Sequence, residues 1–208
     1  NARTRYGGLV GASATMQALF RVLERAASAS TNALLLGESG TGKEVAARAI
    51  HDGSSRAKGP FVALNCGALP AELLESELFG HVKGAFTGAE RDRKGLFVAA
   101  STGTLFLDEI GAAPPRVQVG LLRALQERRV RPVGTEQDVE VDVRIVAATN
   151  ADLDEAMAAG RFRQDLYYRL AGLVVRMPPL RDRPEDIPLL AADIVERIAT
   201  EGGRRVAL

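Results

Sequence analysis

The chain of 208 residues has no tryptophan, few aromatic residues and a single cysteine, Cys66. One cysteine excludes an internal disulfide bond and a cysteine-rich zinc site, and it is typical of a reducing compartment such as the cytoplasm. The sequence also has no apolar run long enough to cross a bilayer and no secretory leader pattern at its N-terminus. We therefore expect a cytoplasmic protein that does not bind membranes.

The chain also lacks an excess of charge of one sign. Lys and Arg total 27 against 26 Asp and Glu, which gives a formal net charge of +1. A domain that binds nucleic acid usually carries a basic surplus, so we expect any DNA binding to belong to a separate domain.

The chain starts at Asn1 without a methionine, which predicts a piece of a longer protein with flanking domains.

Short apolar segments alternate with segments of helical periodicity. The expected strands are Ala33 to Leu36, Phe61 to Leu64, Leu105 to Leu107 and Val143 to Ala148. The expected helices are Ser13 to Ala29, Gly42 to Gly53, Ala71 to Phe79, Val117 to Gln126 and Ile187 to Ile198, with a hairpin over Arg131 to Val141. This alternation is typical of the α/β class, in which helices cover both faces of a parallel sheet.

A glycine-rich segment stands between the first expected strand and the helix after it. Its residues are Gly37, Glu38, Ser39, Gly40, Thr41, Gly42 and Lys43. In this context the segment predicts a P-loop, whose backbone N–H groups and lysine bind phosphate. A glycine-rich turn without a ligand is the alternative. The P-loop lysine is usually followed by a Ser or Thr that binds magnesium, but this chain has Glu44.

Polar residues end three of the expected strands. They are Asp108 and Glu109 after Leu107, Asn65 after Leu64, and Thr149 and Asn150 after Ala148. Ligands of open α/β sheets bind at the carboxyl ends of the strands. Asp108 is suited to hold magnesium, directly or through water, and Glu109 to orient and deprotonate an attacking water. Asn65 can turn its amide towards Glu109, and the Thr149 pair can sense a γ-phosphate; local capping is the alternative for all five.

One hexapeptide carries no group able to catalyse a reaction. It consists of Gly84, Ala85, Phe86, Thr87, Gly88 and Ala89. The glycines give the backbone freedom, and the aromatic ring and hydroxyl are suited to contact another surface. The pattern favours a mobile loop tip that binds a partner, and an ordinary glycine-rich turn is the alternative.

Six segments carry a family resemblance: GESGTGKE (37–44), ESELFG (75–80), GAFTGA (84–89), GTLFLDEI (103–110), FRQDLYYRL (162–170) and PPLRDR (178–183). Together they resemble the central AAA+ ATPase domain of bacterial enhancer-binding proteins, the activators of sigma-54 RNA polymerase of the nitrogen-regulator-C (NtrC) type. The resemblance extends from Val10 to about Ile198. It implies an AAA+ α/β core over 1–180 and the start of an incomplete helical lid over 181–208. Arg204 and Arg205 come too early for the lid's second sensor arginine.

The resemblance also implies roles for single residues. Glutamate commonly follows the P-loop lysine in this family, so Glu44 fits, and Val10 and Gly11 join the nucleotide-binding residues. Asn65 matches a switch that relays the nucleotide state from Glu109 to the hexapeptide, which engages sigma-54. Thr149, with Asn150, matches the first sensor. Arg163 and Arg169 match arginine fingers that reach a neighbouring subunit's site; without the resemblance they read as solvated side chains.

The implied function is a magnesium-dependent, ATP-hydrolysing subunit of a hexameric or heptameric ring that remodels the closed complex of sigma-54 RNA polymerase holoenzyme. A nucleotide-gated adaptor with little turnover, or an AAA+ motor with another substrate, is the alternative.

Four arginines form a basic cluster near the end of an expected helix: Arg123, Arg128, Arg129 and Arg131. A solvated helix end is favoured for this cluster over a contact with promoter DNA. His51 and His81 lack metal-ligand spacing and are expected to be structural or surface residues.

Overall fold

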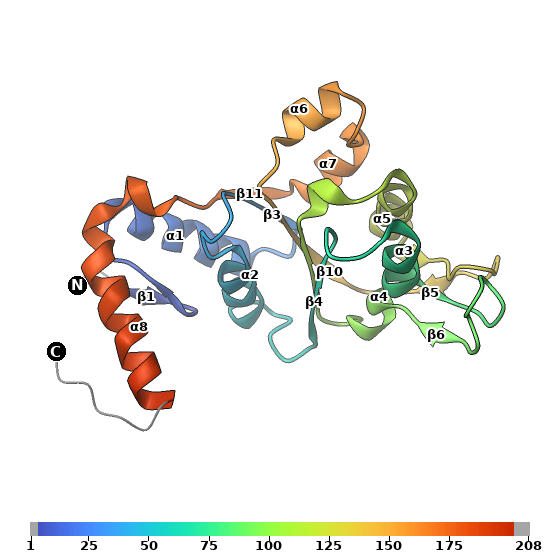
Figure 1. Cartoon of the computed structure of the whole chain (residues 1–208), viewed down its shortest axis with the longest axis horizontal. Helices are drawn as coiled ribbons and strands as arrows, with labels where there is room; N and C mark the ends of the chain where they lie inside the picture. The colour runs from blue at the N-terminus through green and yellow to red at the C-terminus, as the bar shows by residue number, and fades with distance from the viewer. Residues whose placement is uncertain (1–3, 202–208) are drawn as a thin grey trace.

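The structure of the chain is a computed structural model that describes residues 4–201. At its centre lies a five-stranded sheet in the order β11-β3-β10-β7-β4 (Figure 1). The strands are β3 (Ala33–Leu36), β4 (Phe61–Asn65), β7 (Thr104–Asp108), β10 (Arg144–Thr149) and β11 (Leu173–Arg176). Every pair of neighbours is parallel. The parallel sheet and the four strands expected from the sequence are therefore confirmed.

Strand β11 is not among the strands expected from the sequence. This strand pairs only with β3, at one edge of the sheet. Its burial is uneven, because Val175 is buried whereas Val174 is 37% exposed. A short, half-exposed strand leaves a weak periodic signal, and its hydrogen-bonding partner becomes available only when the chain folds.

Helices cover both faces of the sheet, as the α/β pattern predicts. They are α1 (Ala14–Ser28), α2 (Lys43–Asp52), α3 (Ala71–Phe79), α5 (Pro115–Glu127) and α7 (Gln164–Leu170). One core joins α1 and α2 to Phe106 of β7, and the other joins α3, α5 and α7 to Leu105 and Leu107. Successive residues of β7 thus point to opposite faces, and both faces are buried. The Ser13 side chain caps α1 by accepting a hydrogen bond from the Met16 backbone N.

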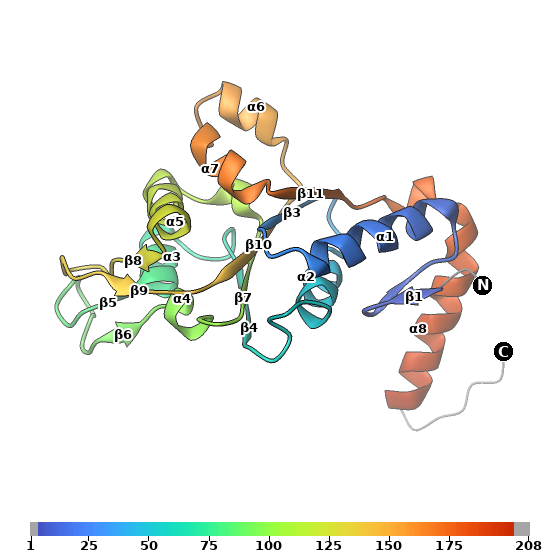
Figure 2. The same ribbon diagram turned by 180° about the vertical axis from the view of Figure 1, so that it is seen from behind.

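Three antiparallel pairs of short strands extend from this core. They are β1 (Arg5–Tyr6) with β2 (Leu9–Val10), β5 (Gly80–His81) with β6 (Arg93–Lys94), and β8 (Arg129–Val130) with β9 (Val139–Glu140). The β8–β9 pair confirms the predicted hairpin. A bridge between His81 and Val133 places the β5–β6 and β8–β9 hairpins side by side, as the view from behind also shows (Figure 2).

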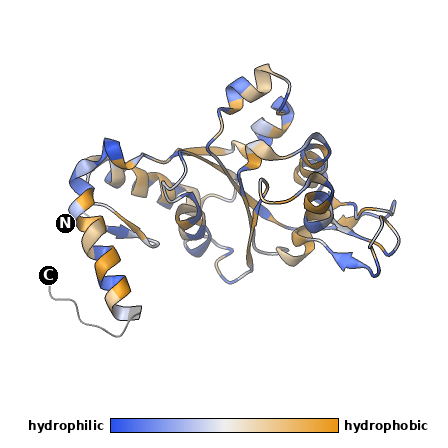
Figure 3. Ribbon diagram, in the orientation of Figure 1, coloured by the Kyte–Doolittle hydropathy of each residue, from blue (hydrophilic) through white to orange (hydrophobic). Residues whose placement is uncertain are grey.

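The remaining elements are short, except for the C-terminal helix. They are α4 (Leu96–Ala99), α6 (Leu153–Ala158), η1 (Ile110–Ala112), η2 (Leu180–Asp182), η3 (Pro184–Asp186) and α8 (Ile187–Glu201). Helix α8 lies at the end opposite the β5–β6 hairpin (Figure 1) and is hydrophobic along much of its length (Figure 3). Its apolar residues Ile194 and Ile198 are exposed. No helix among residues 4–201 is long and apolar enough to cross a membrane. Arg204 and Arg205 lie outside the described residues.

Asp186 ties the segment before α8 to the start of α1. Its side chain is fully buried and accepts hydrogen bonds from the Ala12 backbone N at 2.6 Å, the Ser13 backbone N at 2.8 Å and the Ser13 hydroxyl at 2.7 Å. Burial acts to raise the pKa of Asp186, but these hydrogen bonds and Arg183 outweigh it and lower the pKa. The ionised carboxylate therefore fixes the C-terminal segment against the N-terminal one.

Candidate functional site

The loop between β3 and α2 has the geometry of a P-loop. Gly40 and Gly42 have φ values of 80° and 90°, a left-handed conformation that glycine adopts without strain. Lys43, at the start of α2, folds back so that its Nζ donates to the carbonyls of Gly37 at 2.9 Å and Glu38 at 3.1 Å. Its ammonium group and the helix N-terminus both favour an anion at this loop.

A cavity of about 530 Å³ adjoins the P-loop. Its walls include residues 38–42, Leu9, Val10, Leu180, Arg183 and Leu190. This volume suits a small-molecule ligand, for which about 300–1,000 Å³ is usual. Of the predicted nucleotide-binding residues, Val10 and residues 38–42 line the cavity, whereas Gly11, Gly37, Lys43 and Glu44 do not. A Cβ atom on Gly11 would lie 2.5 Å from Cγ of Met16, so this glycine permits close packing behind the wall.

An ion pair joins the P-loop to the segment after β11. The Arg181 guanidinium donates to both carboxylate oxygens of Glu38, at 2.5 and 2.7 Å. Arg181 thereby holds the pKa of Glu38 below its ordinary value. The ion pair links two walls of the cavity, since both residues line it. Because both side chains are exposed, the pair contributes little to the free energy of unfolding.

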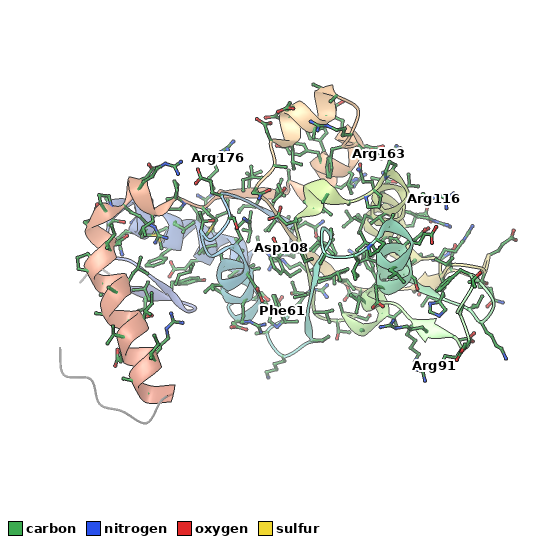
Figure 4. All side chains as sticks on the ribbon, in the orientation of Figure 1. Phe61, Arg91, Asp108, Arg116, Arg163 and Arg176 are labelled. Carbon is green, nitrogen blue, oxygen red and sulfur yellow. The ribbon has the colours of Figure 1, made fainter. Side chains whose placement is uncertain are left out.

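The carboxyl ends of four neighbouring strands bring the predicted polar residues to one edge of the sheet. Asn65 of β4 stands opposite Asp108 of β7, and Thr149 of β10 stands opposite Leu36 of β3. The backbone N of Gly37 donates to the Thr149 carbonyl at 3.2 Å. Asp108 therefore lies in the middle of the molecule, on the edge that leads to the P-loop (Figure 4).

Glu109 follows β7 in a strained backbone conformation. Its φ of 51° is left-handed, which is uncommon for a residue other than glycine and recurs at functional sites. Its backbone N donates to Oδ1 of Asp108 at 2.9 Å. Oε2 of Glu109 accepts a long hydrogen bond from the backbone N of Asn150, at 3.5 Å. The carboxylate is thus directed along the strand ends towards β10.

Asn65 and Thr149 make local contacts at the ends of their strands. Oδ1 of Asn65 accepts from the backbone N of Gly67 at 2.8 Å, and Oγ1 of Thr149 accepts from that of Ala151 at 3.1 Å. Within residues 4–201 no hydrogen bond joins Asn65 to Glu109. Both side chains are therefore held as local caps at the carboxyl ends of their strands.

The carboxylates on this edge suit a magnesium ion bound together with a nucleotide. No group of three or more His, Cys, Asp or Glu residues in the described chain forms a metal site made of protein alone. Magnesium is usually held by one or two carboxylates, with phosphate oxygens and water completing its shell. The carboxylate of Asp108 is of the kind that meets that need, with Glu109 beside it. Glu44 is exposed in the first turn of α2 and supplies no hydroxyl ligand.

Cys66 lies buried beside the acidic edge. Burial, helped by the negative charges of Asp108 and Glu109, raises the pKa of its thiol to about 12. Because the thiolate is the reactive form, we expect the native protein to resist the thiol reagent DTNB at pH 8 and the guanidinium-unfolded chain to react fully. Because the pKa of the thiol is raised above its ordinary value of 9.0, Cys66 stays protonated in the folded chain at pH values where the unfolded chain loses that proton. The free energy of unfolding should therefore fall as the pH rises above 9.0 towards 12. Rapid reaction of the native protein would contradict this burial.

The two predicted arginine fingers flank α7. Arg163 precedes the helix (Figure 4), and its guanidinium donates to the Asp165 carboxylate at 2.7 and 3.0 Å. Asp165 thereby raises the pKa of Arg163. Arg169 lies in the last turn of α7 with an exposed side chain. Neither arginine lines the cavity beside the chain's own P-loop.

The hexapeptide forms the tip of the β5–β6 hairpin, far from the P-loop at one end of the molecule (Figure 1). Gly84 and Gly88 have φ values of 81° and 98°, and a Cβ atom on either would meet nothing within 4 Å. Phe86 is 39% exposed, and Thr87 is also exposed. The tip therefore presents both residues on a backbone with free space around its glycines.

Three arginines of the predicted basic cluster are paired with carboxylates. Arg123 contacts Glu127 and Asp138, Arg131 contacts Asp138, and Arg129 contacts Glu140. Asp138, through its hydrogen bond from Arg131, has a lowered pKa. This pairing favours the solvated-surface interpretation of the cluster over a DNA contact.

Both histidines are buried beside a hydroxyl group. His51 is buried with its Nδ1 2.9 Å from Oγ1 of Thr104, and burial lowers its pKa. His81 is buried with its Nδ1 2.7 Å from Oγ of Ser76. Sequence reasoning missed the hydroxyl partners, because neither pair follows a recognised motif.

Comparison with known sequences identifies a family. The family model of the sigma-54 interaction domain matches residues 9–176. The transcriptional regulatory protein ZraR of Klebsiella oxytoca is 56% identical over 199 residues, which cover 96% of this chain and 45% of ZraR. The response regulator protein PilR of Pseudomonas aeruginosa is 55% identical over 195 residues, which cover 94% of this chain and 44% of PilR. The chain thus spans less than half the length of these relatives.

A solved structure supports the same assignment. The crystal structure of NtrX from Brucella abortus in complex with ADP matches with a TM-score of 0.88 and 39% identity, over 94% of this chain and 42% of NtrX. NtrX has also been solved in complex with ATP. The AAA+ P-loop NTPase fold predicted from the sequence is confirmed. The chain belongs to the sigma-54 interaction domain family, as the central AAA+ domain of a sigma-54-dependent transcriptional activator.

Proposed function

We propose that this chain is an ATP-hydrolysing ring subunit that remodels the closed complex of sigma-54 RNA polymerase holoenzyme. The observation that carries the proposal is the single sheet edge shared by the P-loop, Asp108 and Glu109. The family match supports sigma-54 as the partner. DNA binding is proposed to belong to a separate domain, because the three arginines of the basic cluster that pair with carboxylates leave little free positive charge.

In the proposed reaction, the backbone N–H groups of the P-loop and Lys43 bind the β- and γ-phosphates of ATP. Asp108 would hold magnesium, which when bound would supply positive charge beside the phosphoryl group. Glu109 orients the attacking water and accepts its proton. Thr149 and Asn150, beside the P-loop, respond to the presence of the γ-phosphate.

Helix α3 provides the proposed connection between ATP hydrolysis and the hexapeptide Gly84 to Ala89, which we call the contact loop. The chain leaves the acidic edge at Asn65, turns, and enters α3 at Ala71. Helix α3 then ends at Phe79, directly before β5 and the hexapeptide. A change in the contacts of Asn65 on loss of the γ-phosphate would move the start of α3, and with it the loop that presents Phe86 and Thr87.

The segment from residue 181 onward is proposed to begin a helical lid over the nucleotide. Arg183 and Leu190 from this segment line the cavity together with the P-loop. The buried Asp186 fixes the segment to the start of α1. The exposed apolar side chains of α8, including Ile194 and Ile198, suit packing against further lid helices.

Arg163 and Arg169 are proposed to complete the nucleotide site of a neighbouring subunit, so ATP hydrolysis per subunit should rise with protein concentration. The sharper test mixes two inactive variants, Glu109→Gln and Arg169→Ala, in equal amounts. Half of the subunits keep Glu109 and half of their neighbours keep Arg169, so the mixture should regain roughly a quarter of wild-type activity.

The control mixture replaces Arg169→Ala by Arg161→Ala, which removes an exposed arginine paired with Glu155. Arg161→Ala alone should stay active. The rate of ATP hydrolysis of each mixture is measured as phosphate release, and size-exclusion chromatography shows whether the subunits assemble. A mixture of Glu109→Gln and Arg169→Ala that assembles but shows only the sum of its parts would contradict the shared site.

A further inference from the structure

Phe86, in the contact loop, lies against a histidine that has no part in the nucleotide chemistry. The ring centroids of Phe86 and His81 are 5.0 Å apart and the ring planes meet at 69°, an edge-to-face arrangement. His81 is 8% exposed, whereas Phe86 is 39% exposed. Edge-to-face aromatic pairs attract each other, so Phe86 rests on a buried ring and is not free at the loop tip.

The position of His81 is itself determined by two neighbouring elements. Its Nδ1 lies 2.7 Å from Oγ of Ser76, a buried residue of α3. The backbone beside it is held by the β8–β9 hairpin, since Val82 N donates to the Val133 carbonyl at 3.1 Å and Val133 N donates to the Gly80 carbonyl at 2.9 Å. The imidazole therefore lies between α3 and that hairpin and contacts both through its own residue or its neighbours.

The two glycines of the loop tip leave room for Phe86 to move. Gly84 and Gly88, on either side of it, have open space around their α-carbons. The backbone N of Ala89 donates to the Phe86 carbonyl at 3.0 Å, which closes a local turn and leaves the ring direction undetermined. The ring of His81 is thus a buried surface against which the Phe86 ring is set.

We propose that His81, oriented by Ser76, is a positioning residue that holds Phe86 against the hairpin until α3 moves. Release of the ring would then make Phe86 available to the partner. This inference rests on the proposed function, because it concerns the regulation of the same contact loop. An edge-to-face contact shifts an equilibrium between held and released loops by about 2- to 10-fold.

The lack of tryptophan in the chain allows a test without any partner. Phe86→Trp introduces a single indole at the loop tip, and acrylamide quenching of its fluorescence measures its exposure. In this background, His81→Ala should raise the quenching constant by about twofold or more. The double change Ser76→Ala/His81→Phe removes both polar groups but keeps an aromatic ring, so it should leave quenching near the Phe86→Trp value.

Two further readouts complete the experiment. ATP hydrolysis by the His81 variants should stay within about twofold of the parent, because neither His81 nor Ser76 lies at the acidic edge. Sigma-54 captured without nucleotide should rise by about 2- to 10-fold in His81→Ala. Equal quenching in a folded, ATPase-active His81→Ala and its parent overturns the positioning role. If quenching rises in His81→Ala but sigma-54 capture does not, the positioning role of His81 is supported and sigma-54 as the partner of the contact loop is contradicted.

Discussion

Replacing Glu109 by glutamine should lower kcat for ATP hydrolysis by about 10²- to 10⁴-fold while ATP affinity stays near that of the wild type. Glutamine keeps the length of the side chain and an oxygen that can accept the hydrogen bond from the Asn150 backbone N. It cannot accept a proton from the attacking water. Phosphate release gives kcat, and equilibrium binding of a fluorescent ATP analogue gives the affinity.

The matched control is Glu136→Gln, which changes an exposed glutamate in the loop between β8 and β9. It should keep the wild-type kcat. A Glu109→Gln protein whose kcat falls by less than about tenfold would remove Glu109 from its role as the base. Joint loss of ATP binding and turnover would point to a structural role for Glu109 instead.

Replacing Thr87 by alanine should have its large effect on the partner and not on the nucleotide. An interface hydroxyl that leaves its partner group unpaired costs about 1–3 kcal/mol, so nucleotide-dependent capture of sigma-54 should weaken by about 5- to 150-fold. Thr87 is exposed at the loop tip, at one end of the molecule and far from the P-loop (Figure 1). ATP hydrolysis should therefore stay within about twofold of the wild type.

Thr15→Ala provides the control, because Thr15 is also an exposed threonine but lies in α1, away from the hairpin. It should leave both sigma-54 capture and ATP hydrolysis unchanged. Sedimentation or size-exclusion chromatography shows that the variants assemble alike. If Thr87→Ala loses hydrolysis and capture in the same proportion, the hexapeptide is not a separate contact element.

The parts of the fold that follow from the sequence are those with strong local signals. The apolar run Leu105 to Leu107 predicts a buried central strand, because both of its faces need cover. Ser13 marks the start of α1 because its side chain satisfies a backbone N–H three residues later. Strand β11 depends instead on pairing with β3, more than 130 positions earlier in the chain, and its own pattern is weak.

The candidate site divides in the same way. The P-loop is readable because strand, glycines, lysine and helix are contiguous. The left-handed φ of Glu109 has no such signal, since it arises where β7 ends against η1. Asp186 meets Ser13 across 173 positions, and the contact of His81 with Phe86 requires the folded hairpin. The residues of the P-loop can therefore be predicted from the sequence, whereas the residues that support the site through long-range contacts cannot.

Capture of sigma-54 in the presence of a transition-state mimic tests the coupling of nucleotide state to the contact loop most directly. The wild-type protein and Thr87→Ala are each incubated with magnesium and ADP–aluminium fluoride, with magnesium and ADP, or without nucleotide, and retained sigma-54 is measured. We predict that the wild type retains far more sigma-54 with the mimic than with ADP or without nucleotide, and that Thr87→Ala binds the mimic equally well but retains far less sigma-54 with it. Equal retention of sigma-54 in all three nucleotide states, or by Thr87→Ala, would contradict the coupling.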